Sequence, residues 1–470
     1  MRLTDHQGLQ RLPNSGTRKL ASKAFHPLKT LIMGVVNSPD SAGRMAVTTF
    51  AVRVGGAALA YISQILLARW MGAHEYGIFS VAWTWIIILG LLACIGFSSS
   101  PAKYIPQYKK TGDFSRLRGF LYTSRLAAFL IASIIAVSGI FILFSLRGYI
   151  PTHYVLPMAM VLFCLPLFSV GGVQDGIARS YDWPSLSVLP TYIWRPLGIL
   201  VILFALMTFG EPATAVTAAG AAVAATWGVA LYQMVRLNTR IAQTLPPGPR
   251  TNELPLWLAV SLPMLMVEGF LQLITSADVI MVSFWHSPEE TAVYFAASKT
   301  LALIHFVYFA VRSASAHRFA GFVETNDQAG LRSYVQKSSL WTFGPSLLGG
   351  VILLALAPFL LSLFGSGFSA GYPVIAILML GVLARASIGP VDALLMMTGH
   401  QRSCAAIYAA TFAVNVVLNV IFIPAFGLAG AAAATSLAIC FEAVCLATLA
   451  RHRLSVTTFV PLILLQRRGA

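Results

Sequence analysis

The chain has 470 residues and a net charge of +16 at pH 7, and it is 57% hydrophobic but only 10% charged. Soluble domains usually carry about 25% charged residues. A soluble protein of this length could not solvate so apolar a surface, so the composition excludes that class. The basic residues are spread over separate loops, which also argues against a nucleic-acid-binding protein, in which they gather on one face.

Residues 1–44 are polar and basic. Their longest apolar run, 31–36, is too short for the core of a signal peptide. We predict a disordered cytoplasmic tail. A contact with anionic lipid is the alternative.

About twelve apolar stretches follow, each near the 20 residues that a helix needs to cross the hydrocarbon layer. Membrane spans must be helical, because a lipid-exposed strand would leave its backbone groups unpaired. The sequence therefore predicts an all-α integral membrane protein. The expected spans are 46–69, 77–98, 120–146, 150–172, 185–209, 212–235, 255–284, 291–313, 338–363, 372–395, 402–424 and 428–450.

Lys and Arg fall almost entirely in alternate loops and in both tails. Short loops rich in these residues stay in the cytoplasm, so both termini are predicted to be cytoplasmic. The opposite loops hold little beyond Arg69 and Arg147. The basic loop and tail residues are Lys103, Lys109, Lys110, Arg116, Arg118, Arg236, Arg240, Arg250, Arg318, Arg332, Lys337, Arg451, Arg453, Arg467 and Arg468, besides seven in the amino-terminal tail.

A weak internal repeat relates the two halves. Trp70 and Glu75 match Trp285 and Glu290 at a constant shift, six spans later. Parallel repeats of this kind are a known transporter plan, with the substrate site between the halves near the midplane. The expected parts are a six-helix lobe at 45–236, a cytoplasmic linker at 237–254, a second six-helix lobe at 255–450 and a cytoplasmic tail at 451–470.

Five cysteines lie in apolar spans, and their odd number and spacing favour buried thiols over disulfides or a metal site. The chain has no H-E-x-x-H, G-x-S-x-G or Walker A string. We therefore expect neither an enzyme nor an ATP-driven motor, and no cofactor or metal.

Four short strings, in order, resemble those of a known family. They are 67–79 (LARWMGAHEYGIF), 276–281 (SADVIM), 363–373 (LFGSGFSAGYP) and 397–400 (MTGH). The chain resembles, from 44 to 451, the polysaccharide transporters (Wzx-type flippases), which share a superfamily with multidrug extruders and the lipid II flippase. The family-motif residues are Arg69, Gly72, Glu75, Tyr76, Gly77 and Asp278.

The resemblance implies two six-helix lobes forming a V around a central cavity. It also implies that the protein flips polyprenyl-diphosphate-linked oligosaccharide to the outer leaflet of a bacterial inner membrane, for exopolysaccharide, O-antigen or capsule synthesis. A polysaccharide polymerase and other export proteins would be partners. The long amino-terminal tail departs from the family pattern.

Ionisable residues inside spans cost about 2.5–3.5 kcal/mol each on insertion scales and are therefore functional candidates. Arg195 lies mid-span and Arg385 past the middle of the tenth span, so we expect both to line a cavity. Arg53 and Lys299 fit either cavity lining or structural pairing. Arg125 and Arg312 lie nearer span ends, where snorkelling explains them.

The carboxylates are fewer. Glu268 is central in the seventh span and fits either proton coupling or pairing with a buried Arg. Asp278 lies near the outer end of that span, where a polar lining or cap is expected. Glu442 lies in the twelfth span and could pair with a neighbour.

The signs of these charges separate the candidate functions. The first lobe has Arg53, Arg125 and Arg195 within spans but no mid-span carboxylate. A basic lumen suits a diphosphate, because Arg offers paired donors and stays charged. A cation-coupled multidrug extruder is the nearest alternative. A membrane polymerase or glycosyltransferase is the other, but it would need larger outward loops with acid–base groups. A lipid II flippase usually adds two further helices.

The topology can be tested by labelling single introduced cysteines in intact cells. Sites in 365–370 should react with an impermeant thiol reagent from outside, and sites in 103–118 should react only after the membrane is opened. Labelling of the 103–118 sites in intact cells would reverse the assignment.

Overall fold

The computed structural model of the protein describes residues 41–325 and 327–468. The disorder predicted for 1–44 therefore falls almost wholly outside the described residues. The chain divides into two compact units after Gly55. Of the first unit, the structure describes only residues 41–55, which belong to the first helix, and the rest of the description concerns 56–325 and 327–468.

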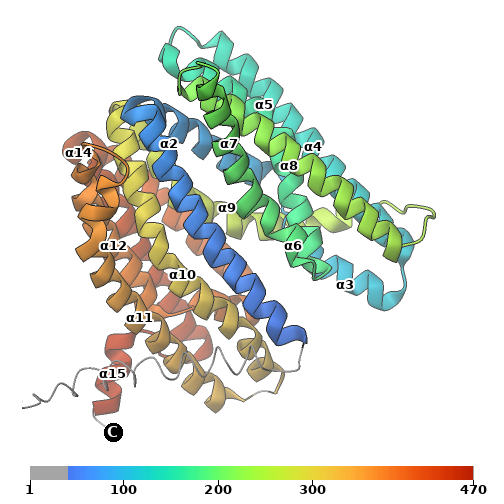
Figure 1. Cartoon of the computed structure of the whole chain (residues 1–470). Coiled ribbons are helices and arrows are strands. Elements are labelled where there is room, and N and C mark those ends of the chain that lie inside the picture. Colours follow the sequence, from blue (N-terminus) through green and yellow to red (C-terminus); the bar gives the residue numbers. More distant parts are fainter. Residues whose placement is uncertain (1–40, 326, 469–470) are drawn as a thin grey trace, which may run out of the picture. The chain divides into compact units, whose positions relative to one another are not determined.

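Every regular element in the described part of the chain is helical, as the apolar pattern predicted (Figure 1). The elements are α2 (Ser41–Ala93), α3 (Pro101–Thr111), α4 (Phe114–Ser145), α5 (Thr152–Ser180), α6 (Pro184–Ser187), a π-helical turn η1 (Pro190–Trp194), α7 (Arg195–Thr208), α8 (Ala215–Thr244), α9 (Leu254–Trp285), α10 (Pro288–Glu324), α11 (Gln328–Ser362), a 3-10 turn η2 (Phe368–Gly371), α12 (Tyr372–Ile388), α13 (Val391–Met397), α14 (Gln401–Leu454) and α15 (Val460–Arg468).

Ten helical segments within the described residues are long and apolar enough to cross a membrane. Two of the long helices change direction at a glycine, α2 at Gly72 (φ 77°) and α14 at Gly427 (φ 60°). A positive φ is inexpensive only for glycine. Each kink separates two predicted spans, so the ten segments contain the twelve spans expected from the sequence. The protein is a multi-pass membrane protein.

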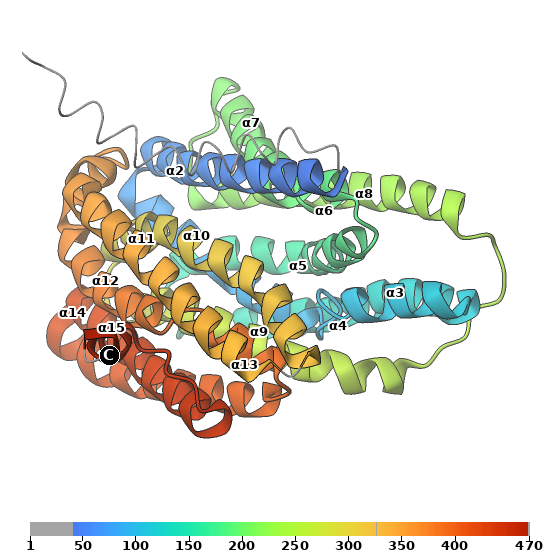
Figure 2. The same ribbon diagram turned by 90° about the horizontal axis from the view of Figure 1, so that it is seen from below.

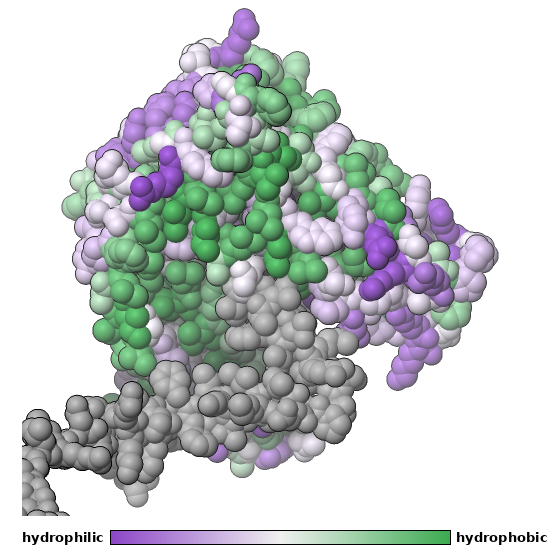
Figure 3. All heavy atoms as spheres, in the orientation of Figure 1, coloured by the Kyte–Doolittle hydropathy of each residue, from purple (hydrophilic) through white to green (hydrophobic). Residues whose placement is uncertain are grey.

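The outer surface agrees with that assignment. Large apolar side chains such as Val137 (69% exposed) and Phe141 (72% exposed) point away from the protein on α4. Figure 3 shows apolar residues covering much of the face in view, with hydrophilic residues gathered toward its edges. A contiguous apolar surface of this kind is unusual on a soluble monomer and is suited to lipid.

Two predicted spans have different bounds in the structure. The span expected at 372–395 is two helices, because α12 ends at Ile388 and α13 begins after Gly389 and Pro390. The span expected at 185–209 starts with the short α6 and the turn η1, and only α7 is regular. Proline explains both breaks, since it lacks a backbone donor and clashes with the preceding turn.

The helices pack mainly within two sets. We call α2–α8 the N-terminal lobe, in which α5 packs on α4 and α8, and α9–α14 the C-terminal lobe, in which α12 packs on α11 and α14. The helix α9 packs chiefly on α14 but also touches α4. Figure 2 shows the loop 245–253 that joins α8 to α9.

The lobes meet through the segment that carries the first family string. Gly77 lies so close to the Pro288 carbonyl that a Cβ at this position would overlap it. The ring of Tyr76 packs against Phe295 (5.9 Å between centroids) and Phe368 (6.3 Å). We call these contacts the inter-lobe junction. By the predicted topology the junction lies at the outer end of the helices.

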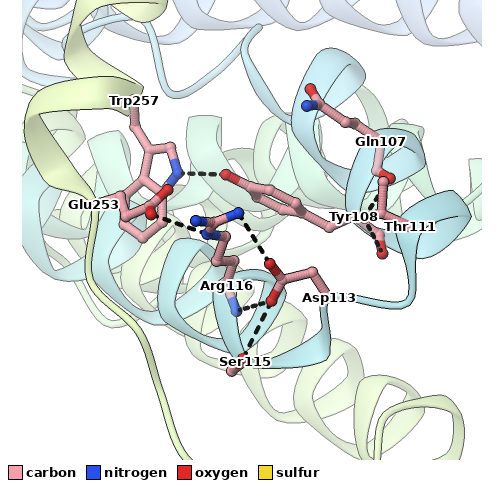
Figure 4. A network of polar contacts seen from close by, with 8 residues as sticks. All are labelled: Gln107, Tyr108, Thr111, Asp113, Ser115, Arg116, Glu253 and Trp257. Atoms are coloured by element: carbon pink, nitrogen blue, oxygen red, sulfur yellow. Dashed lines mark hydrogen bonds and ion pairs between the residues drawn. The ribbon is translucent and has the colours of Figure 1, made fainter.

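At the end predicted to be cytoplasmic, the start of α9 is attached to the N-terminal lobe (Figure 4). Arg116 pairs with Asp113 (3.2 Å) and Glu253 (2.9 Å), and Trp257 Nε1 donates to the Tyr108 hydroxyl at 2.9 Å. Asp113 also caps α4. The hydrogen bond that its carboxylate accepts from the Arg116 backbone is the main reason that its pKa is lowered.

Candidate functional site

Arg195 is a basic side chain within an apolar segment. It opens α7, directly after η1, and is therefore five residues into its apolar segment rather than in the middle of a span. Its guanidinium lies over the rings of Phe168 (4.8 Å) and Trp83 (5.8 Å). Among the described residues it forms no hydrogen bond and no ion pair.

The carboxylate near Arg195 is Asp175, which lies inside the apolar helix α5 and so corrects the expectation that the first lobe has no carboxylate within a span. Asp175 accepts hydrogen bonds from Thr191 Oγ1 (2.6 Å) and Gln233 Nε2 (2.7 Å). These donors satisfy the Asp175 oxygens without a cation in contact. The N-terminal lobe thus presents a fixed positive charge held by aromatic rings, and a cation over a ring face retains its full charge for a further anion.

Arg385 has a partner. Its Nη2 lies 3.3 Å from Glu442 Oε1, and the two side chains are 13% and 1% exposed. The guanidinium also lies over the ring of Tyr308, 5.0 Å from its centroid. A cavity of only about 10 Å³ adjoins the pair, lined in part by His305 and Ser346, which is about the volume that one water requires. The pairing suggested for Glu442 is confirmed.

The two arginines belong to different lobes and to different surroundings. The aromatic neighbours of Arg195 lie on α2 and α5, whereas the partners of Arg385 lie on α10 and α14. A cavity shared by both stays a prediction.

The other expected cavity residues are placed as follows. Lys299 on α10 lies 4.7 Å from the ring centroid of Phe295 and forms no ion pair with any described carboxylate. Arg53 is in α2, and its side chain is outside the described residues. Glu268 accepts a hydrogen bond of 2.5 Å from Ser99 Oγ. No described arginine pairs with Glu268, so of its two expected roles the structure gives no support to pairing with an Arg.

The family-motif residues build the inter-lobe junction. Arg69 donates to the carbonyls of Leu363 (2.6 Å) and Ser362 (3.1 Å) at the end of α11, where a cation is favourable because the last carbonyls of a helix carry partial negative charge. Glu75 accepts from the Ala215 backbone N–H at 2.7 Å and so caps α8. Gly72 forms the kink, and Tyr76 and Gly77 make the cross-lobe contacts described above.

Asp278 is buried, with 3% of its surface exposed. Its carboxylate accepts hydrogen bonds from Tyr294 at 2.5 Å and from Thr435 at 3.4 Å. The side chain is therefore enclosed by its neighbours and does not line an exposed surface. Its carboxylate also accepts from the Val279 N–H, but both residues lie inside α9, so Asp278 does not cap that helix.

Snorkelling was expected for Arg125 and Arg312, and the structure gives both side chains hydrogen-bond partners within the protein. Arg312 does not simply snorkel, because its Nε donates to Asp392 Oδ2 at 2.6 Å, and Asp392 is 2% exposed. Arg125 donates to the Leu121 carbonyl (2.7 Å) and to Asn238 (2.6 Å), so it joins α4 to α8. Sequence reasoning assigned no role to Asp392.

A cavity of about 250 Å³ lies away from these charges. It is bounded by α3, α4 and the start of α9, and Lys103, Gln107, Arg116 and Glu253 are among its lining residues. Both cationic and anionic groups line it, and Arg116 is already paired twice. We therefore do not assign a substrate to this cavity.

Comparison with known proteins identifies the family. The model of the family described as "Polysaccharide biosynthesis protein" matches residues 43–316, more than half of the chain. The chain belongs to this family. A second model, MatE, matches residues 263–421. No relative was found among curated proteins.

Solved structures share the fold of this family member. An inward-facing multidrug resistance MATE family transporter of the MOP superfamily has a TM-score of 0.73 at 13% identity, over 85% of this chain and 94% of that one. The lipid II flippase MurJ, inward closed, has 0.63 at 14%, over 86% and 87%. A MOP superfamily transporter from Pyrococcus furiosus, whose description states a reverse polarity of its binding pocket, has 0.61 at 14%, over 87% and 94%.

The Arg385–Glu442 pair makes a testable contribution to stability. Glu442→Gln would leave Arg385 buried without its counter-ion, which should cost about 3–5 kcal/mol. Replacing both partners, with Arg385→Met and Glu442→Leu, should recover much of that loss. The measurement is thermal or denaturant unfolding of the purified protein in detergent. Glu211→Gln, at an exposed position, is the control, and equal stability of the Glu211 and Glu442 variants would contradict the assignment.

Proposed function

We propose that the protein flips polyprenyl-diphosphate-linked oligosaccharide across the bacterial inner membrane, for exopolysaccharide, O-antigen or capsule synthesis. The observation that carries the proposal is Arg195, a cation within an apolar segment that has no anionic partner among the described residues and is held by two aromatic rings. A charge in such surroundings is costly unless an anion compensates it.

A diphosphate is the anion that fits best. The guanidinium is planar, stays charged and can donate two parallel hydrogen bonds to phosphate oxygens. Family membership supports a substrate of polysaccharide biosynthesis, and one solved structure with this fold is a lipid II flippase. A lipid-linked sugar diphosphate combines the anion, the glycan and the lipid.

The remaining basic residues are given roles in the same proposal. We assign Lys299, Arg53 and Arg385 to the cavity that receives the head group, in addition to Arg195. Arg385 is neutralised by Glu442 in the present arrangement. It could contact the diphosphate only by exchanging this carboxylate for a phosphate oxygen.

Movement of the head group requires the two lobes to change their contacts. In alternating access, the lobes would rock about the basic cavity, and the polyprenyl tail would remain in lipid. The inter-lobe junction, with Gly77 against Pro288, closes one end in the present arrangement. The proposal requires it to open when the head group leaves.

A cation-coupled multidrug extruder is the second candidate. It is favoured by the MatE match at 263–421 and by the fold shared with a multidrug transporter. The unpaired Arg195 weighs against it, because a fixed positive charge in the cavity would repel a cationic drug. A polymerase or glycosyltransferase finds no support in the family match.

The direct test is flipping by purified protein in vesicles that contain a fluorescent polyprenyl-diphosphate oligosaccharide. Loss of a buried charged contact costs about 2–5 kcal/mol, so Arg195→Ala should lower the flipping rate below saturation by at least about 25-fold. Arg147→Ala, which removes an exposed loop cation, should leave the rate unchanged.

Flipping by Arg195→Ala at the parent rate would remove the proposed role of Arg195, and no flipping by the parent would remove the function itself. The same vesicles test proton coupling. Glu268 is our candidate for it, since it is a carboxylate within the span that bonds only to Ser99. Glu268→Gln should still flip the lipid but no longer respond to an imposed pH gradient. An unchanged response would mean that Glu268 is structural.

A further inference from the structure

The cavity of about 250 Å³ at the end predicted to be cytoplasmic has no role in the proposed flipping reaction. It lies between α3, the start of α4 and the start of α9, and we call it the α3–α9 pocket. Drug-sized ligands occupy pockets of about 300–1,000 Å³. The α3–α9 pocket therefore suits a small polar group and is too small for a glycan.

The walls of the pocket are joined by hydrogen bonds between the elements. The Tyr104 hydroxyl on α3 donates to the Leu256 carbonyl at 3.0 Å, and Arg116 at the start of α4 pairs with Glu253 at 2.9 Å. Figure 4 shows Arg116 and Glu253 facing each other beside Tyr108. The pocket is thus formed before a ligand enters, which lowers the entropic cost of binding.

Two charged groups of the pocket have unmet interactions. Lys103 lies 5.6 Å from the ring centroid of Tyr104 and forms no ion pair with any described carboxylate. Glu253 accepts from Arg116 through Oε1, whereas its Oε2 is buried and accepts no hydrogen bond among the described residues. Buried acceptors without donors are rare in folded proteins. A ligand that meets both needs carries an anion for Lys103 and a cationic N–H donor for Glu253.

Apolar side chains continue the pocket toward the membrane. Leu256, which is 53% exposed, and Val260 both line it. They are four residues apart on α9, so they lie on the same face of that helix. The pocket therefore lies where the basic helix α3 meets the apolar part of α9, which by the predicted topology is the level of the lipid head groups in the cytoplasmic leaflet.

A phospholipid with an ammonium and a phosphate in its head group meets all of these requirements. We propose that the α3–α9 pocket binds the head group of phosphatidylethanolamine from the cytoplasmic leaflet. The phosphate would accept from Lys103, the ammonium would donate to Glu253 Oε2, and the acyl chains would begin on Leu256 and Val260. Both polar contacts are charge-assisted hydrogen bonds, which are the stronger class.

The same contacts exclude other common lipids. Phosphatidylcholine carries the same two charges, but its ammonium has no N–H to donate to Glu253. Phosphatidylglycerol carries a phosphate and hydroxyl groups, but it brings no cation to the carboxylate. The pocket is therefore expected to distinguish these three lipids by their head groups alone.

The bound lipid would join the two lobes at this end. Lys103 belongs to α3 of the N-terminal lobe, and Glu253 directly precedes α9 of the C-terminal lobe. A head group between them would add to the Arg116–Glu253 pair and hold the start of α9 against the N-terminal lobe. This effect on transport rests on the proposed function, whereas lipid binding itself does not.

The test measures lipid binding without any polyprenyl lipid. The melting temperature of the purified full-length protein in detergent is recorded as each of the three phospholipids, with identical acyl chains, is titrated in. A ligand that binds only the folded protein raises this temperature. Phosphatidylethanolamine should act at a concentration at least about tenfold lower than the other two. Soluble phosphoethanolamine should have no effect at that concentration, and equal stabilisation by it would overturn a lipid as the ligand.

Two variants test the two polar contacts. Lys103→Gln should need at least about tenfold more phosphatidylethanolamine for the same shift. Lys110→Gln is the matched control, because it removes an exposed lysine of the same helix that does not line the pocket, and its response should equal that of the parent. Glu253→Gln should lose the preference for phosphatidylethanolamine over phosphatidylcholine, a ratio that is measured within one protein.

A measurement on the parent keeps the result decisive if a variant does not fold. Native mass spectrometry after exposure to an equal mixture of the three phospholipids should show one phosphatidylethanolamine retained in preference to the others. Equal retention of the three lipids, equal shifts with phosphatidylethanolamine and phosphatidylcholine, or an unchanged response of Lys103→Gln would overturn the site. Because no polyprenyl lipid is present, these results stay separate from any failure of the flipping experiment.

Discussion

A charge inside an apolar layer must be compensated, and this requirement determines how the interior of the protein is built. Desolvating an ion costs several kcal/mol even after the protein relaxes. The C-terminal lobe meets the cost with a buried pair, Arg385 with Glu442, and a partly buried pair, Arg312 with Asp392. Arg195, Lys299 and Glu268 form no ion pair among the described residues. The proposed function places an anion at Arg195 and proton coupling at Glu268.

The inter-lobe junction is the second determinant of the arrangement. The family string at 67–79 supplies a helix kink, a helix cap and the close contact between lobes. Gly77 lets the two lobes approach at the Pro288 carbonyl more closely than a residue with a Cβ could. Arg69 donates hydrogen bonds to carbonyls at the end of α11. These residues hold the lobes together at one end, and the substrate would be bound by the basic residues deeper in the spans.

Much of the fold could be predicted from the sequence, because each membrane span is a run of apolar residues that are neighbours in the sequence. Gly72 and Gly427 fall between predicted spans, and the structure places its kinks there. The break of the tenth span at Gly389 and Pro390 was missed, because 372–395 is mostly apolar on both sides of it and has the length of one span. The lobe boundaries at 45–236 and 255–450 remain a prediction.

The site was harder to predict, because position along the chain gives the depth of a side chain but not its partner. Arg312 lies near a span end, as a snorkelling residue would, yet its partner Asp392 is 80 residues away. Arg195 was found by depth alone, and its two aromatic neighbours come from distant helices.

Alternating access makes the inter-lobe junction the part that must open in every cycle. His74 and Glu289 face each other across it at 2.7 Å. Cysteines introduced at these two positions can be joined by a cleavable bifunctional thiol reagent, and flipping measured in vesicles before and after reduction. Cross-linking should stop flipping, and reduction should restore it. A cross-link between positions 74 and 153, both in the N-terminal lobe, should have no effect. Flipping at the parent rate with the 74–289 link in place would contradict alternating access.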